Sequence, residues 1–194
     1  MVAMGGPTRA RLRRLLAAAV MVVAALSVAG CGAQSAATYK APDLATMQRQ
    51  TTGLRAVLPI LVELQVVEFD NLPNCRALIM WGQSWSDPAG ANCGYGAVWV
   101  GPKGPRPFTS DVSAAHTRIA EAIAGSGAAI PTVEGISFDV EGKLTVAEFV
   151  LSEDYWNRWS YFYEPGYTLP TQMRGGPDYT AIDSDWYYRH KSWH

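Results

Sequence analysis

The sequence predicts an α+β fold, in which an antiparallel sheet of about five or six strands carries one or two helices on one face and the domain holds one disulfide. Three observations support this class. Segments of alternating apolar and polar residues fill the second half of the chain, helically spaced apolar residues occur in two other stretches, and turn-forming residues link successive strands closely. Close links favour antiparallel pairing, and helices that do not alternate with strands gather on one face.

The first 30 residues are predicted to be a signal peptide. Four arginines among residues 9–14 precede the apolar stretch Leu15–Val28, which ends in small residues. An uncleaved membrane helix is the alternative, because a span needs roughly 17 to 25 apolar residues. Alanine dominates the stretch, however, and makes it weakly hydrophobic for a permanent anchor. The segment Val28-Ala29-Gly30-Cys31 resembles the lipobox of bacterial lipoproteins, which implies cleavage before Cys31 and acylation of its sulfur with fatty acids such as palmitate.

A lipidated Cys31 makes the membrane the first expected partner. The arginines stay on the cytoplasmic side, so the rest of the chain is expected on the extracytoplasmic face. Residues 31–42 begin with small and polar residues and predict a flexible tether, while residues 43–194 predict a single α+β domain. More than one acyl chain holds a protein firmly, since each buried methylene contributes about 0.8 kcal/mol.

Charge and cysteine content narrow the expected functions. Removal of residues 1–30 takes away four of the 16 basic residues and none of the 17 acidic ones, which leaves a net charge of −5. This acidic domain has no basic stripe, so nucleic acid is not an expected partner. Cys75 and Cys93 form an even pair once Cys31 is set aside, and an oxidising exterior predicts a disulfide between them. Two buried free thiols or a redox pair are the alternatives, although no CxxC spacing is present.

The domain is predicted to open with a helix. Pro42-Asp43 provides the start, and apolar residues recur at helical spacing until Pro59 interferes. The apolar run Ile60–Phe69 fits either a continued helix or a strand, and we favour the helix.

Two strands and a second helix are predicted next. Arg76–Trp81 and Tyr95–Val100 are the strands, and the residues between them are rich in turn-forming types. Ser110 is the expected N-cap of a helix that runs to Gly125. The lone His116 on this helix is expected at its surface or boundary.

A meander of strands is predicted to complete the domain. Apolar residues Ile136, Phe138 and Val140 alternate with polar ones, and Glu141-Gly142 then turns the chain into a second strand that ends at Leu151. Residues 159–163 and 185–189 are predicted as two further strands.

Aromatic residues are concentrated between residues 155 and 167 and indicate a candidate binding surface for a protein or glycan ligand. Flat rings offer a large contact area with few rotors to immobilise. In a strand, alternate residues share one face, so half of these rings are expected to point the same way. The competing interpretation is that this face belongs to the core, as most apolar clusters do. The candidate surface comprises Trp156, Trp159, Tyr161, Tyr163 and Tyr167.

Carboxylates and histidines crowd together near the C-terminus, at Asp183, Asp185, His190 and His194. The spacings of zinc and calcium sites are missing there, and chain ends commonly fray, so we predict no metal. The sequence has no Gly-x-Ser-x-Gly or His-Glu-x-x-His motif. It therefore predicts no cofactor and no catalytic residue.

Residues 135–167 resemble the sheet of small α+β immunity proteins of bacterial polymorphic toxin systems. In both, a strand, a Gly-Lys turn and an aromatic strand ending in an acidic residue follow a helix. The main hypothesis is a membrane-anchored, non-catalytic binding or accessory module of the cell envelope. The resemblance adds the alternative of an immunity-type protein that neutralises a secreted toxin. An envelope hydrolase, with a site that the sequence does not reveal, is the second alternative.

Overall fold

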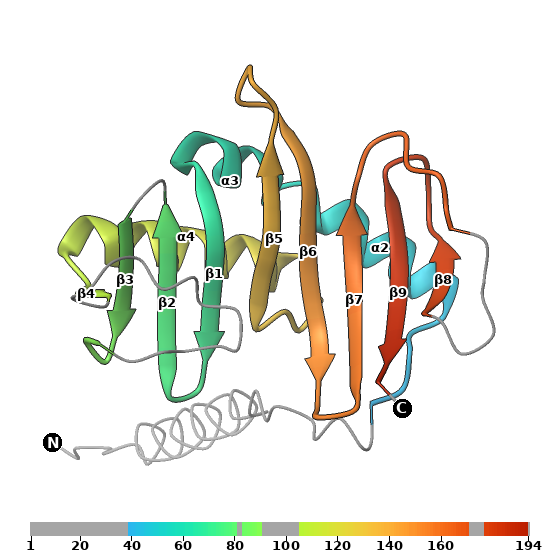
Figure 1. Cartoon of the computed structure of the whole chain (residues 1–194), viewed down its shortest axis with the longest axis horizontal. Coiled ribbons are helices and arrows are strands. Elements are labelled where there is room, and N and C mark those ends of the chain that lie inside the picture. Colours follow the sequence, from blue (N-terminus) through green and yellow to red (C-terminus); the bar gives the residue numbers. More distant parts are fainter. Residues whose placement is uncertain (1–38, 81–82, 91–104, 171–176, 194) are drawn as a thin grey trace, which may run out of the picture. The chain divides into compact units, whose positions relative to one another are not determined.

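A computed structural model of the chain describes residues 39–80, 83–90, 105–170 and 177–193, which contain three helices and nine strands (Figure 1). The helices are α2 (Leu44–Leu54), α3 (Leu58–Leu64) and α4 (Ser110–Gly125). The strands are β1 (Val66–Leu72), β2 (Cys75–Met80), β3 (Gln83–Asp87), β4 (Arg106–Pro107), β5 (Thr132–Phe138), β6 (Leu144–Glu153), β7 (Asn157–Tyr163), β8 (Asp178–Ala181) and β9 (Trp186–Ser192).

The nine strands form one sheet in the order β4-β3-β2-β1-β5-β6-β7-β9-β8. Neighbouring strands are antiparallel except β3 and β4, which pair in parallel, so the sheet is mixed. The predicted α+β class is confirmed, but a purely antiparallel sheet of five or six strands is wrong. Some strands are too short to be recognised from the sequence. β4 has two residues and β8 has four, whereas alternation of apolar and polar residues can be detected only over a longer segment.

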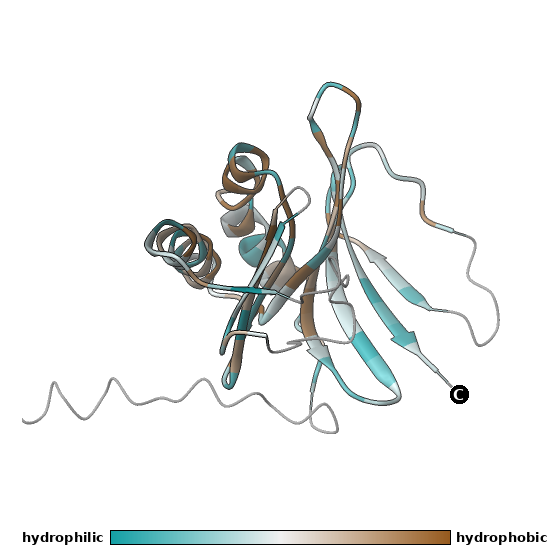
Figure 2. Ribbon diagram, turned by 60° about the vertical axis from the view of Figure 1, so that its left-hand side comes forward, coloured by the Kyte–Doolittle hydropathy of each residue, from teal (hydrophilic) through white to brown (hydrophobic). Residues whose placement is uncertain are grey.

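All three helices lie on one side of the sheet, as Figures 1 and 2 show. Packing on one face agrees with the prediction, although the described residues hold three helices rather than one or two. The core fills the space between the helices and this face. Four of its largest fully buried side chains come from four different strands, namely Phe69, Phe149, Tyr161 and Trp186.

The first predicted helix is two helices. Asp43 caps α2, and its Oδ1 accepts a hydrogen bond from the amide of Thr46 at 2.7 Å. Pro59 lies in the first turn of α3, where its missing N–H leaves no hydrogen bond unmade, so it begins a helix instead of ending one. Gln65 then adopts a left-handed conformation with φ of 51° and closes α3. The expectation of a helix over Ile60–Phe69 is therefore correct only as far as Leu64.

Helix α4 differs from the prediction at its cap and at His116. Thr109, one residue before Ser110, is the N-cap, and its side chain accepts from the amide of Val112 at 3.3 Å. His116 is 2% exposed, and its Nε2 lies 2.8 Å from the carbonyl oxygen of Asp70. Burial lowers the pKa of His116. It is a core residue, not the surface or boundary residue expected, because its ring packs against Phe69 with centroids 4.6 Å apart.

The β5–β6 hairpin turns at Asp139, whose Oδ1 accepts from the amides of Glu141 and Lys143, each at 2.9 Å. Gly142 supplies the positive φ of 81° that the turn requires. Val140 is fully exposed at the tip, because β5 ends at Phe138 and the expected alternation stops there.

Several predictions concern residues that the structure does not describe. The predicted signal peptide over residues 1–30 and the predicted strand Tyr95–Val100 lie outside the described residues. Cys75 begins β2, but its expected partner Cys93 lies outside the described residues, and so does Cys31. The disulfide and the lipid anchor therefore stay predictions. Within the described part of the chain, no helix is long and apolar enough to cross a membrane.

Candidate functional site

The five aromatic residues of the predicted binding surface do not form one exposed surface. Trp159 and Tyr161 have relative exposures of 9% and 0% and belong to the core. Tyr163 shares their face of β7 and is partly buried against the core. Trp156 is 53% exposed in the turn before β7, and Tyr167 is partly buried beyond the strand. The prediction is wrong for Trp159 and Tyr161, because strand alternation directs them toward the helices.

Tyr161 has a structural role. Its hydroxyl donates to Oε1 of Gln50 on α2 at 2.6 Å and so ties the sheet to the helix. Burial raises the pKa of Tyr161, and it also raises that of Tyr39 to about 12. Both phenols therefore stay neutral at physiological pH.

The C-terminal carboxylates and histidines do not converge. Arg55, the C-cap residue of α2, binds both Asp183, at 3.0 Å, and Asp185, at 2.9 Å, in the turn before β9. His190 lies five residues further along the chain, where its ring stacks on Trp159 with centroids 5.0 Å apart. Five residues of a strand span roughly 17 Å, too far for one metal to be shared. His194 lies outside the described residues, which contain no group of three potential metal-binding side chains.

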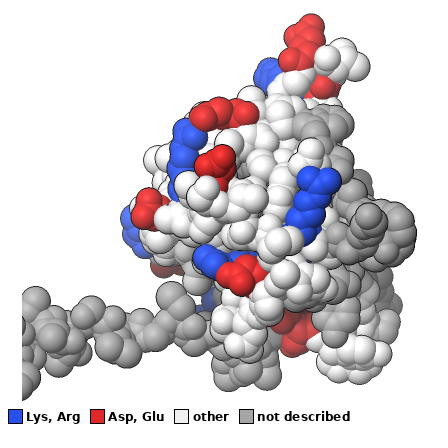
Figure 3. Space-filling model, turned by 90° about the vertical axis from the view of Figure 1, so that its left-hand side faces the viewer, with Lys and Arg blue, Asp and Glu red and all other residues white. Residues whose placement is uncertain are grey.

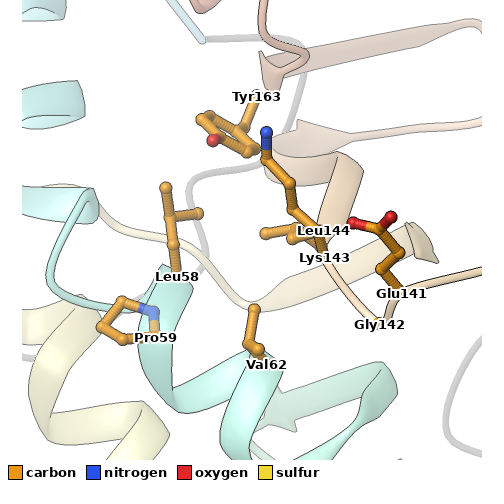
Figure 4. A pocket seen from close by; sticks show the side chains of 8 residues that line it. All are labelled: Leu58, Pro59, Val62, Glu141, Gly142, Lys143, Leu144 and Tyr163. Carbon is orange, nitrogen blue, oxygen red and sulfur yellow. The ribbon is translucent and has the colours of Figure 1, made fainter. Parts of the chain in front are cut away.

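A groove of about 400 Å³ lies between α3 and the β5–β6 hairpin, and we call it the α3 groove. Its lining is shown in Figure 4, where Leu58 and Val62 project from α3 and the chain of Lys143 extends toward Tyr163. The groove is therefore apolar on the helix side and polar on the hairpin side. The lining residues are Leu58, Pro59, Val62, Glu141, Gly142, Lys143, Leu144 and Tyr163.

Tyr163 lines the α3 groove and is also close enough to Asp185 and Arg55 to feel their charges. Burial is the main reason why the pKa of Tyr163 is raised, and the negative charge of Asp185 raises it further. The phenol is thus protonated at neutral pH and can donate a hydrogen bond. Tyr163 is the one residue of the predicted aromatic surface that lines this groove.

The helical side of the groove was not predicted from the sequence. The seven residues of α3 are apolar except Glu63, whereas a helix that covers a sheet usually has one apolar face and one polar face. Only Ile60 and Leu61 are buried among them. The excess of apolar residues over buried positions in this segment could have indicated an exposed apolar surface. It was not recognised, because the whole run Ile60–Phe69 was predicted as one continuous helix.

The face of the sheet away from α2, α3 and α4, here called the far face, carries a network of charged side chains. Arg158 on β7 is its centre: it pairs with Glu134, with Glu153 at 2.7 Å and with Glu148 at 3.6 Å. Arg189 on β9 also pairs with Glu148, at 2.9 Å. Ser160, which is fully buried, donates to the same Glu148 at 2.6 Å.

The geometry of the far-face network is that of a structural ion-pair cluster. Burial raises the pKa of Glu134 despite the opposing charge of Arg158, and a carboxyl group with a raised pKa can serve as a general acid. The Arg158 guanidinium, however, lies directly against this carboxyl group and pairs with it. The arrangement fits a neutralised ion-pair cluster better than a catalytic pair.

Charges on the side of the molecule that bears β3 and β4 are mixed. Figure 3 shows Lys and Arg beside Asp and Glu with neutral surface between them, so the described residues of this side do not present a large patch of one sign. Some of the exposed charges of the described residues are also paired with the opposite sign: Arg118 pairs with Glu63, and Arg76 pairs with Asp87.

Comparisons of this chain with protein-family models, with curated proteins and with solved structures found no match.

Proposed function

We propose that the protein is a lipid-anchored, non-catalytic binding module on the extracytoplasmic face of the membrane, and that the α3 groove binds its partner. The lipobox-like segment ending at Cys31 supports the anchor. The observation that carries the binding role is the apolar side of the groove, where Leu58 and Val62 are half-buried and Pro59 is exposed.

The lining of the groove favours a protein partner over a glycan. Ligand pockets commonly measure roughly 300 to 1,000 Å³, so this one is small and suits one or two apolar side chains of a larger partner. Leu58, Pro59 and Val62 supply an apolar floor, and Lys143 and Glu141 offer one charge of each sign on the other side. Sugar recognition commonly relies on flat aromatic rings, and Tyr163 is the single aromatic residue in this lining.

Photo-crosslinking in intact cells tests this proposal on the full chain. Benzoylphenylalanine in place of Val62, on the floor of the groove, is expected to give a discrete protein adduct. The matched control carries the same group in place of Glu121, which is exposed on α4 outside the groove. Leu58→Asp, added to the Val62 variant, is expected to remove the adduct, because it places a charge on the apolar floor.

The results separate the alternatives. Equal labelling from positions 62 and 121, or no adduct from either, would contradict a binding role for the groove. An adduct with a co-encoded secreted toxin would replace the accessory role with that of an immunity-type protein. Cys31→Ser is expected to release the protein from the membrane fraction, and retention there would contradict the lipid anchor.

A further inference from the structure

Three exposed aromatic side chains form one patch at the end of the sheet where β6 turns into β7. Tyr155 is 83% exposed, Trp156 is 53% exposed and Trp193 is 37% exposed. They come from two segments that a backbone hydrogen bond joins, because the amide of Trp193 donates to the carbonyl of Trp156 at 2.8 Å. The rings of Tyr155 and Trp156 also meet edge to face, with centroids 4.6 Å apart. We call these three residues the aromatic end.

The aromatic end is held in place by its turn. Asp154 Oδ1 accepts from the amides of Trp156, at 2.7 Å, and Asn157, at 2.6 Å. Two large apolar side chains are thus projected into solvent by a hydrogen-bonded turn, although burial of each is worth about 1.5 to 3 kcal/mol. Such an arrangement indicates a surface that meets an apolar or interfacial partner.

The residue types match a membrane interface. Trp and Tyr are enriched at the headgroup level of bilayers, where their rings are half in and half out of the apolar layer. Lys191 adds a cation for anionic headgroups, and its Nζ lies 4.9 Å from the centroid of the Trp193 ring. The nearby carboxylates are already engaged, because Glu153 pairs with Arg158 and Asp154 bonds to the turn amides.

The tether is long enough for the aromatic end to reach the membrane. Tyr39 lies eight residues after Cys31, and a fully extended chain of that length reaches at most about 29 Å. Tyr39 packs on Trp159, which lies three residues beyond Trp156 in the same hairpin. Strand β6 has ten residues and is roughly 33 Å long, so the β5–β6 turn lies at the opposite end of this strand from the aromatic end.

We infer that the aromatic end rests in the headgroup region of the membrane that holds Cys31, with Tyr155, Trp156 and Trp193 at the interface. This inference rests on the proposed lipid anchor. It orients the domain with β6 rising from the bilayer and with the α3 groove facing the envelope space. The tether limits how far the domain can lie from the membrane, and the aromatic end limits how the domain is oriented on it.

Fluorescence quenching of the full-length lipidated protein tests this orientation. The protein is reconstituted into vesicles of phosphatidylcholine and phosphatidylglycerol with a nitroxide on part of the headgroups, which quenches nearby tryptophans. The double variant Trp156→Tyr/Trp193→Tyr keeps interfacial rings but removes two of the seven tryptophans. It is expected to lose most of the quenching that the wild-type protein shows.

Val140→Trp is the matched control, because it places a new tryptophan on the fully exposed tip of the opposite hairpin. Its added fluorescence is expected to remain unquenched. Flotation of the same vesicles separates the two proposals. A wild-type protein that does not float overturns both the anchor and the orientation. A protein that floats keeps the anchor, but the orientation is overturned if the double variant loses no quenching or if the added fluorescence of Val140→Trp is quenched equally.

Discussion

On the helix side of the sheet, Phe149, Tyr161 and Trp186 are fully buried in an apolar core, whereas on the far face Arg158, Glu148 and Ser160 form a network of ion pairs and hydrogen bonds. The two environments lie one residue apart on the same strand, because successive side chains of a strand point to opposite faces. Tyr161 and Ser160 are both fully buried, yet only the first has apolar neighbours from the helices.

This difference teaches that burial alone does not identify a core in this molecule. Several acidic and hydroxyl side chains are less than 10% exposed, and they lie on the face that the helices do not cover. The helix side gains its stability from removal of apolar area from water, while the far face depends on charges that must stay paired. The two faces are therefore expected to respond differently to truncation, to loss of a charge and to pH.

The largest expected effect is a truncation on the helix side. Phe149→Ala is expected to lower the free energy of unfolding by about 3–5 kcal/mol, because the fully buried ring leaves a cavity in a packed core. Phe162→Ala, on the far face of the next strand, is expected to cost less than half as much. Its ring stacks on Tyr187 and lies 4.3 Å from the Arg189 guanidinium, and both long side chains can close over the gap. Urea denaturation measures both, and equal losses would show that the far face is packed as rigidly as the core.

The next effect is loss of the central charge on the far face. Arg158→Met is expected to cost about 2–3 kcal/mol, since it leaves Glu134 and Glu153 without their cation in a partly solvated site, while Glu148 keeps only Arg189. Adding Glu134→Gln is expected to recover part of this loss, because it removes one of the unpaired charges. Denaturation of the single and double variants tests the coupling. If Glu134→Gln gives no recovery, the two residues do not interact through charge.

The smallest expected effect is a pH dependence from Asp70. This carboxyl group is 1% exposed, and burial raises its pKa despite hydrogen bonds with the side chains of Thr132 and Glu68. Because its pKa is higher in the folded state, the protonated form favours folding. The contribution of Asp70 to stability is thus fully present below the ordinary aspartate pKa of 3.8 and is lost as pH rises through the raised folded value.

Asp70→Asn separates this contribution from other titrations. The variant is expected to be more stable than the wild-type protein at neutral pH, and the difference is expected to shrink as pH falls through the raised folded pKa. The amide keeps an oxygen that can accept from Thr132, which now donates to Asp70 at 2.8 Å. Urea midpoints of both proteins at a series of pH values provide the measurement. A constant difference across the series would argue against a shifted carboxyl group at this position.

Elements with a strong local pattern were predictable. The helix ending at Gly125, the strand over residues 159–163 and the hairpin turn near Gly142 lie where the sequence places them, because helical spacing, alternation and a glycine turn act over a few residues. The switch from helix to strand at Gln65 was not predictable, since an apolar run fits both structures. β3 was missed because its Gln, Ser and Asp residues are typical of turns.

The candidate site could be predicted only in part. Tyr163 was identified by the density of aromatic residues, but its partners Leu58 and Val62 come from α3, about a hundred residues earlier in the chain. No local pattern connects these positions. Arg55, which binds Asp183 and Asp185, was likewise invisible as their partner, since the contact joins the C-cap of α2 to the turn before β9.

The sequence by itself determined the α+β class, the alternation of faces along β7 and the expectation of a lipid anchor at Cys31, because each depends on the order of neighbouring residues. Only the tertiary structure decided which face of β7 meets the helices, and hence that Trp159 and Tyr161 are core while Trp156 is exposed. It also decided that Arg158 gathers three carboxylates from two other strands. The physical reason is that periodicity assigns side chains to faces, whereas the pairing of strands and the docking of helices decide what each face contacts.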